Sequence, residues 1–128
     1  MPISIRIADG VLAGGSAPFL LLAGPDVIES EAHALRMARA LAGIARERGI
    51  GLVFKASFDK ANRTSAASYR GPGLAEGLRV LRRVKEETGL PVTTDFHVPE
   101  QAAALAPVVG LLPVPAFLCR QTDLLLAA

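Results

Sequence analysis

The sequence predicts an α/β protein: the N-terminal half of a (β/α)8 barrel, preceded by a β-hairpin. Three observations lead to this. Four short apolar runs each precede a helical pattern, polar residues follow each run directly, and 51% of the residues are hydrophobic without any tryptophan. Repeated strand–helix units imply a parallel sheet with right-handed crossovers. Polar groups at the carboxyl ends of such strands are typical of barrel active sites.

The first element is a hairpin. Residues 3–15 alternate apolar and polar side chains around Asp9-Gly10, which is a hairpin turn signal. We therefore divide the chain into an N-terminal hairpin, residues 1–18, and an incomplete (β/α) barrel domain, residues 19–128.

The first strand–helix unit begins with the continuous apolar run at residues 19–23, which predicts a buried strand. Ser30 is a suitable N-cap for the helix that follows, and acidic residues on both sides of it suit the positive end of the helix dipole. Gly49, preceded by basic residues, ends that helix. Residues 51–56 are the second predicted strand.

The later units are shorter. A helix with apolar residues at helical spacing follows Gly73 and ends at Gly89. Residues 91–94 predict a third strand with a short helix after it, and residues 108–114 predict a fourth strand. A final helix opens at Thr122-Asp123. A doubly wound sheet is the alternative, but its glycine-rich first turn is missing.

Four units make half of such a barrel. The last helix reaches Ala128 without a cap, and the first and fourth strands would be unpaired edges. We therefore expect the sequence to be the N-terminal half of a longer protein, with a self-contained small fold as the alternative.

Composition narrows the function classes. The formal charge is only +2, and no aromatic stacking platform accompanies the cations, which argues against nucleic-acid binding. The lone Cys119 excludes an internal disulfide and suits a reducing cytoplasm. The N-terminus does not resemble a signal peptide, and the run at residues 17–23 is too short to span a bilayer.

The segment at residues 53–73 carries most of the chemistry. It starts as a buried strand and becomes a long loop in which four cations face a single acid, Asp59, among hydroxyl groups and an amide. A loop of this length is uncommon unless it binds something or is disordered. Cations mixed with hydroxyl donors suit a ligand with several anionic oxygens. The alternative is a solvated basic loop. Against it, Lys55 leaves a buried strand end, and the rigid Gly71-Pro72-Gly73 ends the loop.

Four motifs in order closely resemble 3-deoxy-D-manno-octulosonate-8-phosphate (Kdo-8-phosphate) synthases. They are Lys55-Ala-Ser-Phe-Asp-Lys-Ala-Asn-Arg-Thr-Ser, Ser68-Tyr-Arg-Gly-Pro-Gly-Leu, Thr94-Asp-Phe-His and Pro115-Ala-Phe-Leu-Cys-Arg-Gln-Thr-Asp-Leu. The resemblance runs from about Phe19 to the end. It implies a cytoplasmic TIM-barrel transferase, tetrameric in the full-length family, that condenses phosphoenolpyruvate with arabinose 5-phosphate in lipopolysaccharide synthesis.

The resemblance also implies residue roles. Lys55 and Ser57 would hold phosphoenolpyruvate beside the Ala116–Phe117 backbone, and Lys60 would polarise the aldehyde as the enol carbon attacks it. Asn62 and Asp95 would bind the hydroxyl groups of the pentose. Arg63 and Thr64 would bind the pentose phosphate of a neighbouring subunit. Arg120 would have a place in the pocket. His97 either has a place in the pocket or is a packed, hydrogen-bonded histidine.

This sequence departs from the family at several positions. Asp26 stands where metal-dependent members have a cysteine ligand and metal-independent ones an asparagine. The aspartate can ligate a hard divalent ion, or it can hydrogen-bond nearby backbone. Pro113 replaces a substrate-contacting glutamine and removes an N–H from the fourth strand, and Gly110 replaces an acid. Cys119 occurs in family members and is interpreted as a buried structural thiol.

Two alternatives remain beside the synthase. The related 3-deoxy-heptulosonate-phosphate synthases have Lys-Pro-Arg where this chain has Lys60-Ala-Asn-Arg, so Asn62 favours the pentose substrate. The other alternative is a non-catalytic sugar-phosphate-binding half-barrel, whose exposed apolar edges could pair with one another. We expect no synthase activity from the 128 residues alone.

Overall fold

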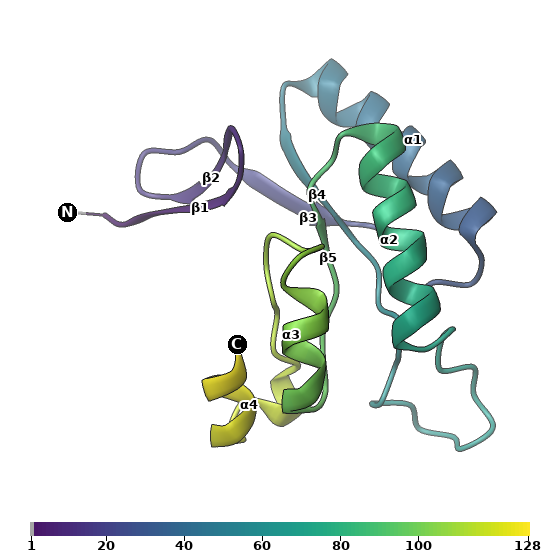
Figure 1. Cartoon of the computed structure of the whole chain (residues 1–128). Coiled ribbons are helices and arrows are strands. Elements are labelled where there is room, and N and C mark those ends of the chain that lie inside the picture. Colours follow the sequence, from purple (N-terminus) through teal and green to yellow (C-terminus); the bar gives the residue numbers. More distant parts are fainter. Residues whose placement is uncertain (1) are drawn as a thin grey trace.

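The computed structural model describes residues 2–128, which form a hairpin and a separate three-stranded sheet (Figure 1). In the hairpin, β1 (Ser4–Ala8) pairs antiparallel with β2 (Val11–Gly14). Gly10 has a φ of 73° in the turn between them, a conformation that glycine adopts without steric cost. The residues predicted as a hairpin thus form one.

The second sheet is parallel and has the order β3-β4-β5. Its strands are β3 (Leu20–Ala23), β4 (Gly51–Lys55) and β5 (Val92–Thr93), and the helices that connect them are α1 (Glu31–Arg48) and α2 (Leu74–Thr88). The chain therefore contains two consecutive βαβ units that share β4. Figure 1 shows α1 and α2 side by side against one side of the sheet.

The ends of α1 and α2 follow local signals. Ser30 accepts a hydrogen bond from the His33 N–H, 3.2 Å away, and so caps α1 as predicted. Gly49 and Gly89 are the C-caps of α1 and α2, each in the left-handed conformation. Ion pairs of Arg79 with Glu31 and of Arg39 with Glu87 join the two helices on their exposed faces.

The prediction of a fourth strand at residues 108–114 is wrong. Only Leu111 pairs, in a single parallel bridge with Thr93, and Thr93 Oγ1 also donates to the Leu111 carbonyl at 2.8 Å. Pro113 has no N–H to extend the ladder. Gly110 contacts the hairpin so closely that a Cβ there would lie 2.3 Å from the Ile7 carbonyl oxygen. The segment therefore meets the edge strand β5 at one point, where the Gly110 N–H also donates to the Val92 carbonyl at 3.2 Å, but it does not form a strand.

The remaining helices are short. A 3-10 turn, η1 (Pro99–Gln101), leads into α3 (Ala102–Leu105), and another, η2 (Ala116–Leu118), precedes α4 (Thr122–Ala127). Within residues 2–128, no helix is long and apolar enough to cross a membrane.

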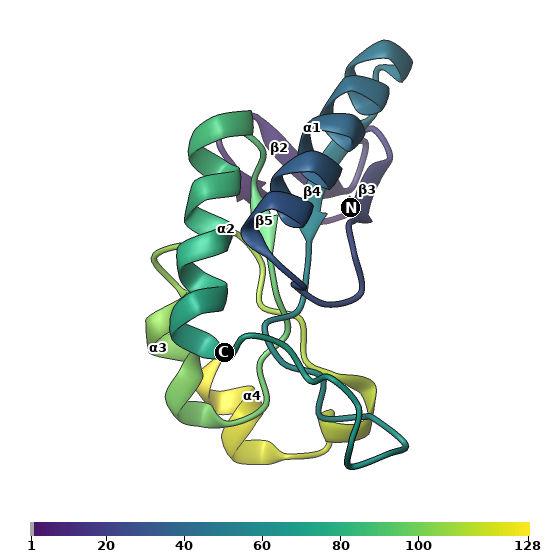
Figure 2. The ribbon, with the colours of Figure 1, turned by 90° about the vertical axis from the view of Figure 1, so that its right-hand side faces the viewer.

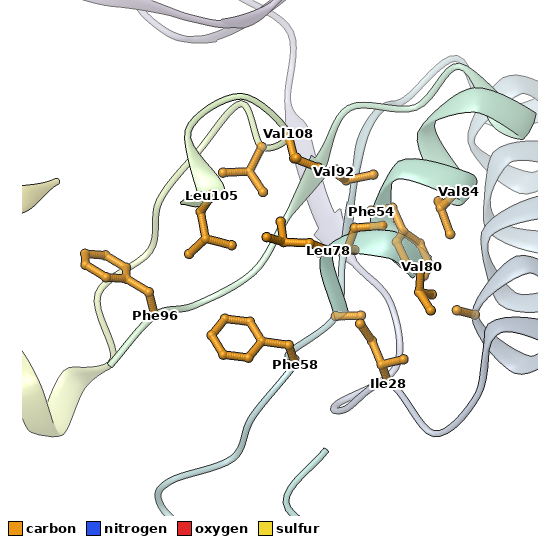
Figure 3. Packing of buried hydrophobic residues seen from close by; sticks show 14 of the residues in the cluster. Ile28, Phe54, Phe58, Leu78, Val80, Val84, Val92, Phe96, Leu105 and Val108 are labelled. Atoms are coloured by element: carbon orange, nitrogen blue, oxygen red, sulfur yellow. The ribbon is translucent and has the colours of Figure 1, made fainter. Parts of the chain in front are cut away.

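The hydrophobic core lies between the sheet, α1, α2 and the segment around α3 (Figure 3). Its largest fully buried side chains include Phe54, Phe58, Phe96 and Leu105. The strand β3 is less buried: it pairs only with β4, and Leu21 and Leu22 are 36% and 43% exposed. The core is thus centred on β4 and α2, the elements on either side of the polar loop.

Candidate functional site

The segments that follow β3, β4 and β5 come together beyond the carboxyl ends of the strands. The chain after β3 runs parallel to the chain after β4: Val27 bridges Ser57, and the Ile28 N–H donates to the Ser57 carbonyl at 2.9 Å. Gly24 permits this approach, because a Cβ there would lie 1.9 Å from the Lys55 carbonyl oxygen. Figure 2 shows the polar loop and the segment before α4 at this same end of the molecule.

Four predicted site residues form one group at the ends of β4 and β5, joined by hydrogen bonds and close charge contacts. Lys55 Nζ donates to Ser57 Oγ at 3.0 Å and lies 3.8 Å from Asp95 Oδ1, to which the Ser57 hydroxyl donates. His97 Nε2 lies 3.5 Å from the other oxygen, Asp95 Oδ2. The Asp95 carboxylate is therefore the centre of the group, which contains an ammonium, a hydroxyl and an imidazole.

His97 is packed more tightly than a freely exposed histidine. Its ring meets Phe58 edge-on with the centroids 6.1 Å apart, and its buried Nδ1 has no hydrogen-bond partner within the described part of the chain. His97 is therefore packed against Phe58 and lies close to the Asp95 carboxylate, and its place in a substrate pocket stays a prediction.

Lys60 brings a second cation close to Lys55. Partial burial lowers the pKa of Lys55; Asp95 opposes this effect, and the nearby ammonium of Lys60 adds to it. Two neighbouring ammonium groups repel each other unless an anion lies between or beside them. In this chain Asp26 and Asp95 lie beside the two ammonium groups, so the clustered cations are partly compensated from within.

Asp26 lies against the basic loop. Its Oδ1 is 2.8 Å from Lys60 Nζ, and its Oδ2 is 3.4 Å from Arg63 Nη2. The hydrogen bond from Lys60 lowers the pKa of Asp26, with Arg63 and Lys55 contributing through their charge. Asp26 is therefore ionised at neutral pH.

The alternative that Asp26 ligates a metal stays a prediction. Both of its oxygens face cations, and residues 2–128 contain no group of three histidine, cysteine, aspartate or glutamate side chains that could hold an ion. A divalent ion needs several oxygen or nitrogen ligands. We therefore derive no step through a metal.

The loop is closed on itself by residues to which the sequence had not assigned a role. Arg70 donates to both oxygens of Asp59, at 2.8 and 2.7 Å, and the Lys60 N–H donates to the Arg70 carbonyl at 2.7 Å. The Tyr69 hydroxyl donates to the Ile28 carbonyl at 3.0 Å. Tyr69 and Arg70 stand in the Ser-Tyr-Arg-Gly motif, which was the available signal. Their carbonyl groups position the two cations of the loop: the Arg70 carbonyl accepts from the Lys60 N–H, and the Tyr69 carbonyl accepts from Arg63 Nε.

We expect an Asp59→Asn variant to loosen residues 59–73 at neutral pH. The hydrogen bonds from Arg70 lower the pKa of Asp59 from its ordinary value of 3.8. The ion pair between Asp59 and Arg70 therefore contributes fully to the stability of the loop above the ordinary pKa of aspartate. This contribution is lost as the pH falls through the lower pKa that Asp59 has in the folded chain. Amide hydrogen exchange at Lys60 measures this. In the variant it should be faster at neutral pH. Equal exchange in both proteins would contradict the expected role of the pair.

The remaining predicted site residues are exposed, and the structure does not join them to the group. Asn62 and Thr64 lie on the loop, Ala116 and Phe117 in η2, and Arg120 just after it. In residues 2–128 no side-chain hydrogen bond or ion pair involves these five. Cys119 is also exposed, so the prediction of a buried thiol is wrong.

A cavity of about 430 Å³ lies elsewhere, between the hairpin and the start of β5. Its lining includes Ile7, Lys85, Pro91 and Gly110 and none of the predicted site residues. The polar group at the other end of the strands has more specific chemistry, and we take that group as the candidate site.

Comparisons with known proteins give a matching family and several relatives. The family model described as the DAHP synthetase I family matches residues 2–128. The chain is 57% identical over 128 residues to the 2-dehydro-3-deoxyphosphooctonate aldolase of Syntrophotalea carbinolica, covering all of this chain and 46% of that protein. It is 59% identical over 111 residues to 2-dehydro-3-deoxyphosphooctonate aldolase 2 of Arabidopsis thaliana, covering 87% of this chain and 38% of that protein. The chain thus spans less than half the length of these two relatives.

Proposed function

This chain belongs to the DAHP synthetase I family, and from that premise we propose that it carries part of the active site of a Kdo-8-phosphate synthase. The reaction joins phosphoenolpyruvate and arabinose 5-phosphate to give 3-deoxy-D-manno-octulosonate 8-phosphate and phosphate. Curated relatives that are 52–59% identical over the matched residues are named 2-dehydro-3-deoxyphosphooctonate aldolase. The proposed enzyme acts in the cytoplasm as a homo-oligomer.

The observation that carries the proposal is the group formed by Lys55, Ser57 and Asp95, with Lys60 beside it. Phosphoenolpyruvate has a phosphate and a carboxylate, so its pocket needs clustered cations and hydroxyl donors. Lys55 and Ser57 would hold these anionic groups. The Ala116–Phe117 backbone and Arg120 would complete the pocket from the segment before α4.

Lys60 has the central chemical role in this proposal. When the enol carbon attacks the aldehyde carbon, negative charge develops on the aldehyde oxygen. An ammonium held at that oxygen stabilises the transition state more than the ground state, which is the condition for acceleration. The Lys60 side chain is only 10% exposed, so water screens its charge less than at the surface.

The pentose would lie on the loop side. Asp95 and Asn62 would bind its hydroxyl groups, with His97 supporting Asp95, while Arg63 and Thr64 would hold its phosphate. In the family arrangement these last two serve a neighbouring subunit, whereas here Arg63 contacts Asp26 of its own chain. The two βαβ units are consistent with residues 19–128 as part of a (β/α)8 barrel that follows the hairpin at residues 1–18.

A chimera tests the proposal. These 128 residues replace the matching segment of the Syntrophotalea carbinolica relative, and phosphate release is measured with phosphoenolpyruvate plus arabinose 5-phosphate. We expect activity from the chimera, none from the chain alone, and preference for arabinose 5-phosphate over erythrose 4-phosphate. Preference for erythrose 4-phosphate would favour a heptulosonate-phosphate synthase. A folded chimera that binds both substrates without turnover would favour a non-catalytic binding protein.

A further inference from the structure

Each carboxylate oxygen of Asp26 faces a different cation of the basic loop. Oδ1 is 2.8 Å from Lys60 Nζ, and Oδ2 is 3.4 Å from Arg63 Nη2. A single carboxylate thus bridges an ammonium and a guanidinium that are three residues apart in the loop. This is how a carboxylate or phosphate of a ligand would use the same two groups.

The contact is part of a tied structure. Lys60 is 10% exposed in its side chain, and its N–H is held by the Arg70 carbonyl. Arg63 Nε donates to the Tyr69 carbonyl at 3.3 Å, and Tyr69 in turn bonds the chain just after Asp26 through the Ile28 carbonyl. The loop therefore holds both cations near Asp26.

Asp26 also changes the charge of the site. Lys55, Lys60 and Arg63 are three cations, and Asp26 and Asp95 are two carboxylates, which leaves a formal charge of +1. A neutral residue at position 26 would leave +2. An incoming anion therefore meets a site whose positive charge is already partly compensated from within.

We propose that Asp26 lowers the anion affinity of this site, because its carboxylate contacts both Lys60 and Arg63, two cations that an anionic ligand would otherwise meet without an internal competitor. The inference rests on the proposed function insofar as that function assigns Lys60 and Arg63 to phosphorylated substrates. Binding exchanges one anion for another: the ligand displaces the Asp26 carboxylate, whose side chain is 64% exposed and therefore borders the solvent.

The test is titration calorimetry of the 128-residue chain with inorganic phosphate and with phosphoenolpyruvate, in the presence of EDTA. Removing the internal anion should tighten binding in Asp26→Asn by about two- to fivefold, the range expected for a largely exposed ion pair. Asp26→Ala is the second variant and should show the same gain. Asp9→Asn is the matched control: it makes the same charge change on a fully exposed hairpin residue and should leave the affinity unchanged.

The outcomes separate the two ideas. Equal or weaker phosphate binding in both Asp26 variants, or an equal gain in Asp9→Asn, overturns the role of Asp26. A second titration omits EDTA and adds a divalent ion. Phosphate binding that needs this ion in the wild type, and is lost in Asp26→Asn, would make Asp26 a metal ligand and would also overturn the proposed role. If the Asp26 variants bind inorganic phosphate more tightly but the chimera is inactive, the role of Asp26 is supported and the proposed reaction is not. If the chimera is active but the Asp26 variants do not bind phosphate more tightly, the proposed reaction is supported and the role of Asp26 is overturned.

Discussion

A Lys60→Ala substitution in the chimera is expected to lower kcat by about 10²–10³-fold, the cost of removing one donor aimed at developing negative charge. Lys60 is buried, with 8% of the whole residue exposed, and it lies beside both Lys55 and Asp26. Its ammonium would meet the aldehyde oxygen only as the new carbon–carbon bond forms. Steady-state kinetics with both substrates measure the effect, and KM should change less than kcat.

The matched control is Arg82→Ala, which removes one positive charge from an exposed position of α2 away from the strand ends. It should leave kcat and KM within about twofold of the unsubstituted chimera, as expected of a surface change far from the site. A Lys60→Ala chimera that kept its kcat while its KM rose would show that Lys60 binds substrate without acting in the chemical step.

The second large effect concerns a glycine in α2. Gly77→Ala is expected to destabilise the chain by about 1–3 kcal/mol through overpacking. A Cβ at Gly77 would lie 2.3 Å from Phe58 Cβ and 3.4 Å from Phe58 Cα, and Phe58 is 1% exposed in the core. Phe58 comes directly after Ser57, so the shift also reaches the site. The midpoint of urea unfolding measures the change.

Gly43→Ala is the control for this prediction, because it makes the same substitution inside α1 where no atom lies within 4 Å of the added Cβ. It should stabilise the chain by about 0.5–1 kcal/mol through the lower backbone entropy of alanine. The two substitutions are therefore expected to have opposite signs. A Gly77→Ala variant as stable as Gly43→Ala would mean that Phe58 moves aside at no cost.

Local signals predicted the helices well. Ser30 caps α1, and Gly49 and Gly89 end α1 and α2, because a cap depends on hydrogen bonds within a few residues. The apolar run at residues 108–114 was harder to interpret. Its composition suits a strand, but only Leu111 pairs with a neighbour. Apolar content alone does not tell whether a segment joins a ladder or packs beside it.

The sequence also predicted the group at the strand ends in part. It placed Lys55, Ser57 and Asp95 after successive strands, and the structure joins them by hydrogen bonds. It left Asp26 open between a metal ligand and a backbone contact. It counted Arg70 among the loop cations without pairing it to Asp59, which is 11 residues away, and it gave no role to Tyr69, whose partner Ile28 is 41 residues away.

By itself, the sequence determined the first three strands of the parallel sheet, the ends of the two long helices and the residue types that follow the strands. These depend on residue type and on near neighbours. Only the tertiary structure decided which acid meets which cation. Asp26 reaches Lys60 and Arg63 because the chain after β3 runs along the chain after β4, close enough at Gly24 to exclude a Cβ. That approach is set by packing between segments about 30 residues apart, beyond the range of any local pattern.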